Sequence, residues 1–199
     1  MAKTQRAEAR NAIDLLMDDH KRVNKLFEDF EDVDREDMEA VQELVETACI
    51  ELQIHSILEE EIFYPAMRAG VSDNDRECDD LLNEAQVEHE SADELIARIQ
   101  ELDPDDAMYP AYFTVLSEYV KHHVKEEETG LFAKAREMGL DLQQLGEDMR
   151  LRREELFSEM EADELDPEAE SLDDIEASGD GEEESEDVLQ DLDIPRTRH

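Results

Sequence analysis

The sequence predicts an all-α protein: an antiparallel up-down-up-down four-helix bundle with an additional C-terminal helix and a disordered acidic tail. Residues that favour helices, among them Leu, Ala, Glu, Met and Arg, dominate between only 6 glycines and 5 prolines in 199 residues. Apolar residues recur every three or four positions along residues 7–160, as one buried helix face requires. Histidines at positions 20, 55, 89 and 123 are 34 or 35 residues apart, which indicates one helix and one loop per step.

Each predicted helix follows from an apolar stripe that ends at a turn signal. The helices are expected over residues 7–30, 37–68, 75–102, 106–139 and 140–160. The second helix carries the stripe Val41, Val45, Ala48, Leu52, His55, Glu59, Ile62 and Ala66, and the fourth carries Tyr112, Leu116, Tyr119 and His123. Short turns between long amphipathic helices make neighbours antiparallel. The expected domains are a bundle, a fifth helix and a tail, at residues 7–139, 140–160 and 161–199.

The charge of the chain is strongly negative, with 60 acidic and 19 basic residues and a formal charge of −41. Residues 161–193 hold 17 acids and no base, so we expect a disordered tail that can meet a protein partner. Residues 1–160 still carry a net charge of −26, which suggests a proteome adapted to high salt. The alternative is an acidic protein of an ordinary cytoplasm whose tail binds a basic partner.

Charge and hydropathy exclude several classes of function. Phosphate backbones and anionic membrane surfaces attract clusters of Lys and Arg, so the sequence predicts no binding to nucleic acid or membranes. No run approaches the roughly 18 to 20 apolar residues of a spanning helix, and the N-terminus lacks the apolar core of a signal peptide. We therefore expect a cytoplasmic protein. Cys49 and Cys78 form no CxxC pair and indicate neither a disulfide framework nor a thiolate zinc site.

Two of the predicted helices carry a histidine followed four residues later by a glutamate. Residues four apart share one helix face, so both side chains reach the same point of the interior. Buried carboxylates are costly unless they are paired or bound to a cation, and the predicted stripes contain no Lys or Arg. A set of imidazoles and carboxylates suits two iron ions, with manganese or zinc as alternatives. The candidate metal ligands are His20, His55, Glu59, His89, His123 and Glu127.

Residues beside these ligands have simpler interpretations. His122 points about 100° away from His123 and is expected at the surface, although a shift by one residue would pair it with Glu126. Tyr112 and Tyr119 are expected in the core, with a hydrogen bond to a bound ligand as the alternative. The acids expected to be solvated flanks are Glu60, Glu61, Glu126 and Glu128.

The chain resembles the hemerythrins, more specifically the bacterial and archaeal hemerythrin-like domains with the HHE cation-binding signature. The resemblance covers residues 11–138 and rests on His20, on His55-x-x-x-Glu59-Glu60 followed by Ile62-Phe63-Tyr64-Pro65, on Glu88-His89, and on His123-x-x-x-Glu127-Glu128 followed by Leu131-Phe132. It implies a non-haem diiron centre inside the bundle. It also implies that Glu59 and Glu127 bridge or chelate the irons, with an open position for O2 or a similar small molecule.

The sequence departs from this family in the third and fourth helices. Oxygen-carrying hemerythrins place two histidines one turn apart on the third helix. Here Ala85 lies one turn before His89, and Asp93 lies one turn after it. Their carboxylate on the fourth helix is an aspartate five residues after the histidine, at the position of Glu128. One ion is therefore expected to have fewer nitrogen ligands, and the sequence leaves open whether Asp93, Glu88 or a water completes the site.

Two functions of different classes follow from this interpretation. The first is a diiron protein that binds O2 or reacts with peroxide or nitric oxide, for storage, sensing or detoxification. The second is an iron-responsive, non-catalytic binding or regulatory module, in which metal occupancy orders the bundle and the tail or fifth helix meets a partner.

Overall fold

The computed structural model describes residues 10–71 and 75–165, and of residues 161–165 it describes the backbone alone. Within these residues all regular secondary structure is helical, as the sequence predicts. Four helical rods are formed by α1 (Ala12–Asp32), by α2 (Met38–Leu58) with η1 (Glu59–Phe63) and α3 (Tyr64–Gly70), by α4 (Arg76–Gln100), and by α5 (Tyr109–Glu126) with η2 (Glu127–Leu131) and α6 (Phe132–Met138). A further helix, α7, spans Leu142–Leu165.

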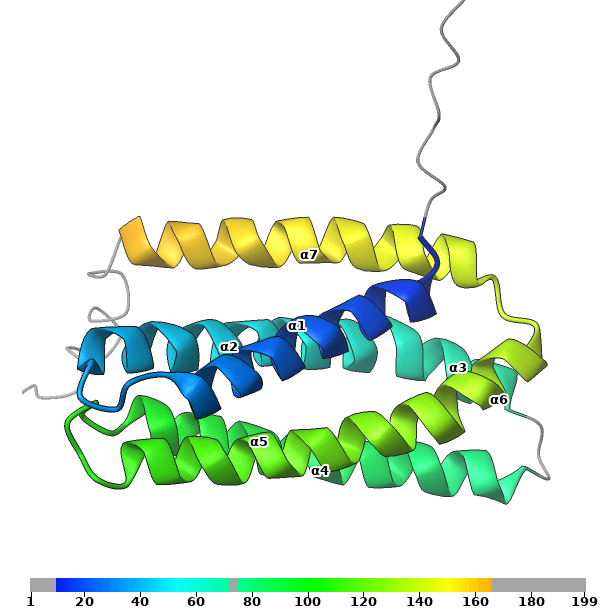
Figure 1. The fold of residues 1–199 in the computed structure, drawn as a ribbon. Helices are drawn as coiled ribbons and strands as arrows, with labels where there is room; N and C mark the ends of the chain where they lie inside the picture. Colours follow the sequence, from blue (N-terminus) through cyan, green and yellow to red (C-terminus); the bar gives the residue numbers. More distant parts are fainter. Residues whose placement is uncertain (1–9, 72–74, 166–199) are drawn as a thin grey trace, which may run out of the picture. The chain divides into compact units, whose positions relative to one another are not determined.

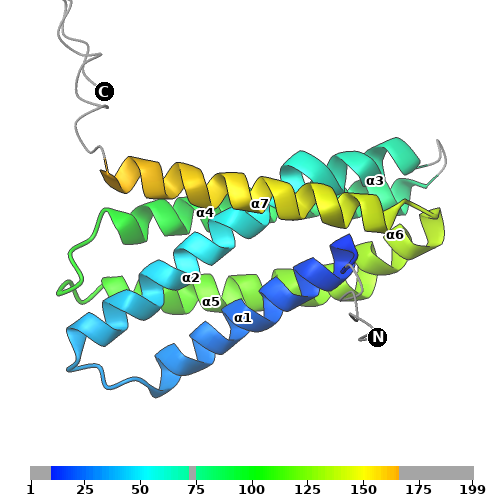
Figure 2. The ribbon, with the colours of Figure 1, turned by 90° about the horizontal axis from the view of Figure 1, so that it is seen from above.

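The rods lie side by side in two layers, and each layer is one helical hairpin (Figure 1). One hairpin joins α1 to α2, and the other joins α4 to α5. As far as Met160, the helix α7 lies along the outer side of the α1–α2 layer, as the view from above also shows (Figure 2). The described residues up to Met160 form one compact unit, so this part of α7 belongs with the rods.

Asn and Asp residues fix where the helices begin. Asn11 accepts a hydrogen bond from the backbone N–H of Asp14 at 3.1 Å, and Asp37 and Asp75 cap α2 and α4 in the same way. Because Asn11 is this cap, the first helix begins at Ala12 rather than at residue 7, and residues 7–9 of the prediction lie outside the described residues.

The largest of the other differences from the predicted helix boundaries are at the start of the fourth helix and the end of the fifth. The fourth helix begins at Tyr109 rather than 106, since a turn over residues 101–108 precedes it and Pro110 occupies its first turn. The end of this helix agrees with the prediction, because Gly139 ends α6 in the left-handed conformation, with φ of 70°. The fifth helix continues to Leu165, and the predicted tail beyond that residue lies outside the described residues.

The core consists of two apolar clusters at opposite ends of the rods. The cluster nearest α3 and α6 includes Ile13, Leu58, Phe63 and Phe132, together with Met149 and Leu156 of α7. The other cluster includes Phe27, Val45, Ile96, Phe113 and Leu116. Between these clusters the interior is polar, because each rod contributes a buried histidine there and two rods also contribute a buried glutamate. The apolar ends therefore enclose one polar layer.

The predicted stripe of the second helix is correct as far as Glu59 and wrong beyond it. The buried side chains that follow are Phe63, Tyr64 and Met67, whereas Ile62 and Ala66 are half-buried. The reason is a π-helical turn in which the backbone N–H of Tyr64 donates to the carbonyl oxygen of Glu59, five residues earlier. This wider turn adds one residue and shifts the buried face by one position. The same turn follows Glu127, where Phe132 donates to it.

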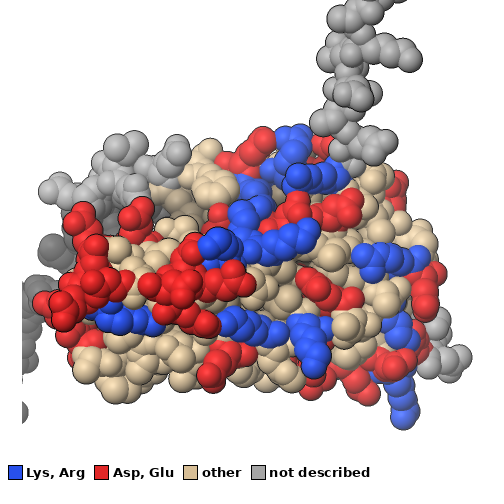
Figure 3. Space-filling model, in the orientation of Figure 1, with Lys and Arg blue, Asp and Glu red and all other residues tan. Residues whose placement is uncertain are grey.

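Acidic side chains cover much of the surface seen in Figure 3, and basic side chains occur there in smaller groups, one of them along α7. The basic residues of this helix are Arg150, Arg152 and Arg153. Across residues 10–71 and 75–165, no helix has both the length and the apolar character that crossing a bilayer requires.

Candidate metal centre

All six predicted metal ligands lie in the polar layer between the two apolar clusters. His20 comes from α1, His55 from α2, His89 from α4 and His123 from α5, while Glu59 and Glu127 each begin a π-helical turn. Their exposed fractions range from 0% for Glu59 to 6% for His123, so all six side chains are buried. The structure therefore brings together, from four separate rods, the residues that the repeat places at one height.

The first candidate cation position is surrounded by His20, His55, Glu59 and Glu127, each of which offers one ligand atom within 4.8 Å of the others. The two Nε2 atoms of His20 and His55 are 3.3 Å apart. Nε2 of His55 lies 3.2 Å from Oε2 of Glu59, and Nε2 of His20 lies 3.3 Å from Oε2 of Glu127.

The second candidate position is surrounded by Glu59, His89 and His123. Nε2 of His89 lies 3.3 Å from Oε2 of Glu59 and 3.3 Å from Nε2 of His123. Nε2 of His123 is 4.0 Å from Oε2 of Glu127, so this carboxylate approaches both positions. Glu59 belongs to both groups, and the two positions therefore share a ligand residue.

The other nitrogen of each imidazole faces a carboxylate. Nδ1 of His20, His89 and His123 lies 3.0, 2.9 and 2.8 Å from carboxylate oxygens of Glu128, Glu60 and Glu88, in that order. Nδ1 of His55 faces Asp19 at 3.6 Å. An Nδ1–H that donates to a carboxylate leaves Nε2 with a free lone pair, which is the form that binds metals. The four imidazoles are thus oriented with Nε2 toward the centre.

These four carboxylates follow the internal repeat. Asp19, Glu60 and Glu128 were not predicted as part of the site, and Glu88 was one of the alternatives left open for completing it. Asp19 and Glu88 directly precede a ligand histidine, and each faces the histidine of the neighbouring rod in its own hairpin. Glu60 and Glu128 directly follow a ligand glutamate and contact the opposite hairpin. The expectation that Glu60 and Glu128 are solvated flanks is therefore wrong. The sequence feature that could have predicted these contacts is that acids recur at equivalent positions of the two halves.

Tyr64 is a further site residue that the sequence interpretation did not single out. Its hydroxyl donates to Oε2 of Glu59 at 3.0 Å and lies 3.2 Å from Oε1 of Glu127 and 3.4 Å from Nε2 of His89. Phe132 holds the equivalent position in the other half and stacks on the ring of His20, with centroids 5.7 Å apart. At this position the two halves therefore differ by one hydroxyl group.

Several pKa values in the centre are displaced. Burial alone would raise the pKa of Glu59, but His55 and His89 hold it well below its ordinary value. Burial and the charge of Glu59 raise the pKa of Glu127. Burial opposes the charged imidazole of His55, yet Glu59 and Asp19 raise its pKa well above the ordinary value. Such opposite shifts indicate that two facing carboxylates cannot both be charged easily without a counter-charge.

Asp19 connects the centre to α7. Its side chain is 1% exposed and accepts hydrogen bonds from both guanidinium nitrogens of Arg153, with Nη1 at 2.8 Å. Arg22 of α1 contacts the same carboxylate. Burial alone would raise the pKa of Asp19, but the nearby imidazole of His55 and the guanidinium of Arg153 lower this pKa to about 2. The fifth helix therefore contacts the centre through one buried ion pair.

The donor set fits metal cations. Among the described residues, Nδ1 of His55, Oε1 of Glu59 and Oε2 of Glu127 are buried and have no hydrogen-bond partner. Buried polar atoms are seldom left unpaired, and carboxylate oxygens around converging imidazoles are suited to a divalent ion. Asp93 is exposed and belongs to neither group, whereas Glu88 is bonded to His123. These His and Glu groups can hold metal.

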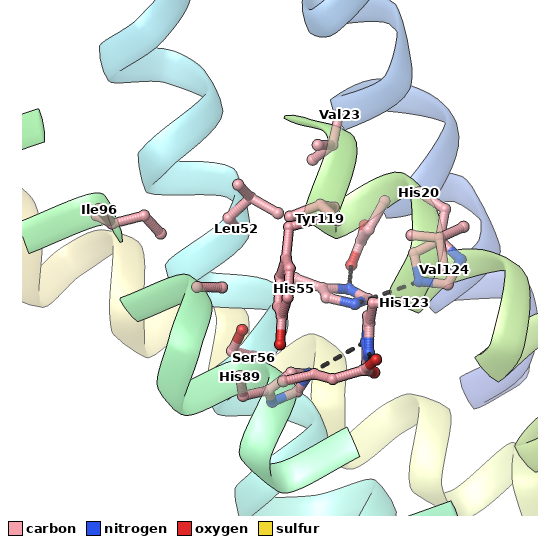
Figure 4. A pocket seen from close by; sticks show the side chains of 14 residues that line it. His20, Val23, Leu52, His55, Ser56, His89, Ile96, Tyr119, His123 and Val124 are labelled. Atoms are coloured by element: carbon pink, nitrogen blue, oxygen red, sulfur yellow. Dashed lines mark hydrogen bonds and ion pairs between the residues drawn. The ribbon is translucent and has the colours of Figure 1, made fainter. Parts of the chain in front are cut away.

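A cavity of about 20 Å³ borders the four imidazoles (Figure 4). Its lining combines these histidines with apolar side chains from all four rods, among them Val23, Leu52, Ile96 and Val120. Tyr119 also lines it and is half-buried, rather than fully buried as expected. A space of this size holds about one water-sized molecule. The cavity therefore limits what can reach the imidazoles to very small molecules.

Comparison with known proteins agrees with this geometry. A DNA nickase from Nostoc sp. is 28% identical over 126 residues, which are 63% of this chain and 34% of the nickase, so the chain spans about a third of that relative. The crystal structure of a hemerythrin HHE cation binding domain-containing protein from Mycobacterium kansasii has the same fold. Its TM-score is 0.65 at 22% identity, covering 77% of this chain and 91% of that one. Residues 11–135 match the family model of the hemerythrin HHE cation binding domain, and the chain belongs to that family.

Proposed function

We propose that the protein is a non-haem diiron protein of the hemerythrin-like class, built as an antiparallel up-down-up-down four-helix bundle. It binds O2, or reacts with peroxide or nitric oxide, for storage, sensing or detoxification. The observation that carries this proposal is the pair of buried donor groups that share Glu59. Two cation positions with a common carboxylate match the arrangement that two-metal centres in helical bundles use.

Iron is the metal that the donors favour. His20, His55 and the two glutamates would hold one ion, and His89 and His123 would hold the other together with Glu59. Imidazole and carboxylate together suit iron, with manganese and zinc as competitors. When bound, the iron pair would supply one-electron chemistry and affinity for oxygen species, which protein side chains lack.

The side chains of the chain itself orient the donors and exclude water. The carboxylates at Nδ1 fix each imidazole and increase its basicity toward a metal. The hydroxyl of Tyr64 places a proton between Glu59 and Glu127. The apolar wall of the cavity, with Val23, Leu52 and Ile96, keeps bulk water from the imidazoles. A cavity of about 20 Å³ holds about one water-sized molecule, which restricts the ligand to a very small molecule.

The similarity to a DNA nickase does not lead us to propose action on DNA. The match covers only a third of that protein, so its activity can reside in the remaining two thirds. The present chain carries a formal charge of −41, which opposes association with a phosphate backbone. We therefore keep the prediction that the partner is a small molecule and not a nucleic acid.

A second candidate function is an iron-responsive regulatory module. The contact from Arg153 through Asp19 to His55 favours it, because it links α7 to a candidate ligand. In this case, metal occupancy would strengthen the attachment of α7 and change what the following acidic segment presents to a partner. This module would show a large difference in stability between metal-free and metal-loaded protein and little turnover.

The test is reconstitution with ferrous iron under anaerobic conditions in high salt, followed by exposure to O2, peroxide or nitric oxide. The first function predicts ligand-to-metal absorption bands that appear with one of these molecules and vanish in His55→Ala. Persistent bands would indicate a carrier, and bands that decay with repeated turnover would indicate an oxidoreductase. Iron-loaded protein that responds optically to none of the three would contradict the first function and leave the regulatory module.

A further inference from the structure

The two halves of the centre are covered differently. Because His20 aligns with His89 and His55 with His123, each position in α1 or α2 has an equivalent in α4 or α5. Ile54 and Leu58 belong to the apolar cluster that contains Met149 and Leu156 of α7, and the half-buried Leu15 packs against this cluster. Their equivalents in the other half, in the same order, are Glu84, His122 and Glu126. Where one half is sealed by apolar side chains beneath α7, the other presents carboxylates and an imidazole.

Three of the residues on the open half form a cluster with metal-binding geometry. One ligand atom from each of Glu88, His122 and Glu126 lies within 4.8 Å of the others. Nε2 of His122 is 3.2 Å from Oε1 of Glu126, and these side chains are 61% and 40% exposed. The side chain of Glu88 is 13% exposed, and its Oε2 contacts Nδ1 of the candidate ligand His123. The cluster thus extends from solvent to the rim of the buried centre.

A narrow hollow leads inward from this cluster. Its polar lining consists of Glu84, Glu88 and Glu126, which are partly or fully exposed, and of the buried His123 and Glu127. Its apolar lining consists of Leu81, Ala85 and Leu131. Glu127 is 2% exposed, and its Oε2 lacks a hydrogen-bond partner among the described residues. A buried carboxylate oxygen without a partner is a strong attraction for a cation that reaches the hollow.

We propose that Glu88, His122 and Glu126 form an outer divalent-cation site, and that metal ions bind there before they pass along the hollow to the buried centre. The proposal rests on the metal-binding function proposed above. An imidazole with two carboxylates suits Fe²⁺ and similar ions but holds them loosely when half-exposed, which fits a transit site. A buried centre also requires an access path. In the sealed α1–α2 half, the apolar Ile54 and Leu58 stand at the positions equivalent to His122 and Glu126, and the equivalent of Glu88 is Asp19, which is 1% exposed and paired with Arg153.

The test measures how fast metal-free protein takes up Co²⁺, whose visible absorption changes when imidazole and carboxylate replace water. The variant is the double substitution His122→Asn and Glu126→Gln, which leaves Glu88 on His123. The matched control is Glu90→Gln, which removes the same charge from an exposed position of α4. Stopped-flow rates are recorded over a range of Co²⁺ concentrations in high salt, and final stoichiometry and thermal stability are measured for each protein.

An outer site predicts that the wild-type rate saturates with Co²⁺ concentration, because binding precedes transfer. In the double variant the rate should become linear and fall about tenfold, at the low end of what electrostatic steering provides, with the final stoichiometry unchanged. Glu90→Gln should behave as the wild type. Equal rates in the double variant and the wild type would overturn the outer site alone. Folded wild-type protein that takes up no Co²⁺, Fe²⁺ or Mn²⁺ would overturn the proposed function, and the outer site with it.

Discussion

At the scale of single residues, Glu127 shows most clearly that the centre is arranged for a cation. Burial and the facing charge of Glu59 raise the pKa of this carboxyl above its ordinary value of 4.5. A raised pKa in the folded state stabilises the fold below the unfolded value, and this contribution is lost as the pH rises through the folded value. At neutral pH without metal, the charged form of Glu127 therefore destabilises the folded state.

Glu127→Gln should remove this destabilising charge from the metal-free protein. We expect the variant to be more stable than the wild type near pH 7.5, with a smaller difference near pH 5, because the wild-type carboxyl is charged at the higher pH and nearer its neutral form at the lower one. The measurement is urea unfolding with a chelator in constant high salt. The same variant should bind metal more weakly. A destabilised metal-free variant at neutral pH would show that the carboxylate stabilises the fold without a cation.

The residues that sequence reasoning found and missed differ in how their signals arise. The six candidate ligands were accessible because a repeat puts one histidine per helix at the same height and two glutamates one turn further on. Of the carboxylates at Nδ1 of the histidines, only Glu88 was named, as an open alternative, because one more acid among 60 carries little information. Tyr64 was hidden because an aromatic residue after the HxxxE pattern looks like core, and only the contacts show its hydroxyl between the two glutamates.

At the scale of elements, the π-helical turns show why an apolar stripe with α-helical spacing does not predict the buried face beyond the metal ligands. A bond from Tyr64 to Glu59 spans five residues instead of four, and no side-chain pattern in the sequence announces it. The predicted face therefore failed at Ile62 and held everywhere before it in that helix. The predicted face of the fourth helix is also wrong at Tyr112, which is half-buried beside the fully buried Phe113, although no π-helical turn precedes it in α5.

The attachment of α7 to α1 depends on a close backbone approach at Gly146. A Cβ atom at this position would lie 2.6 Å from the carbonyl oxygen of Arg10 and 2.9 Å from the backbone nitrogen of Ala12. Backbone atoms cannot move aside as a flexible side chain does, so an alanine must push the helix outward. Gly146 is therefore required by packing rather than by local helix preference.

Gly146→Ala should lower the free energy of unfolding by about 1 to 3 kcal/mol, the usual cost of overpacking. Helix propensity alone would favour alanine by about 1 kcal/mol, so the sign of the effect is diagnostic. Gly130→Ala is the control, because its Cβ would meet only Leu81 side-chain atoms at 3.4 and 3.7 Å, an ordinary contact. Urea unfolding in constant salt compares the three proteins. A Gly146→Ala variant more stable than the wild type would contradict the described position of α7.

At the scale of the whole molecule, negative charge governs the conditions in which the fold is stable. Residues 1–160 alone carry a net charge of −26, and the basic residues of α7 lie mostly in ion pairs with neighbouring acids. Like charges on a folded surface repel one another, and salt shortens the range of that repulsion to about 3 Å at 1 M. We therefore expect stability to depend strongly on ionic strength.

The melting temperature of the metal-free protein should rise steadily with KCl, by roughly 10 °C or more between about 0.1 and 2 M, if screening relieves several kcal/mol of repulsion. Circular dichroism at fixed pH measures it, with a chelator present so that metal binding does not contribute. A melting temperature that is constant or falls over this range would contradict the interpretation of the acidic surface as an adaptation to high salt.

The central claim is that two metal ions share one buried carboxylate, and metal analysis of defined variants tests it most directly. Protein reconstituted anaerobically with ferrous iron and freed of excess metal should retain about two ions per chain, one for each donor group. Glu59→Gln should lose both ions, because Glu59 belongs to both groups, whereas His89→Ala should lose one. Folded wild-type protein without bound metal, or a Glu59→Gln variant that keeps both ions, would contradict the account.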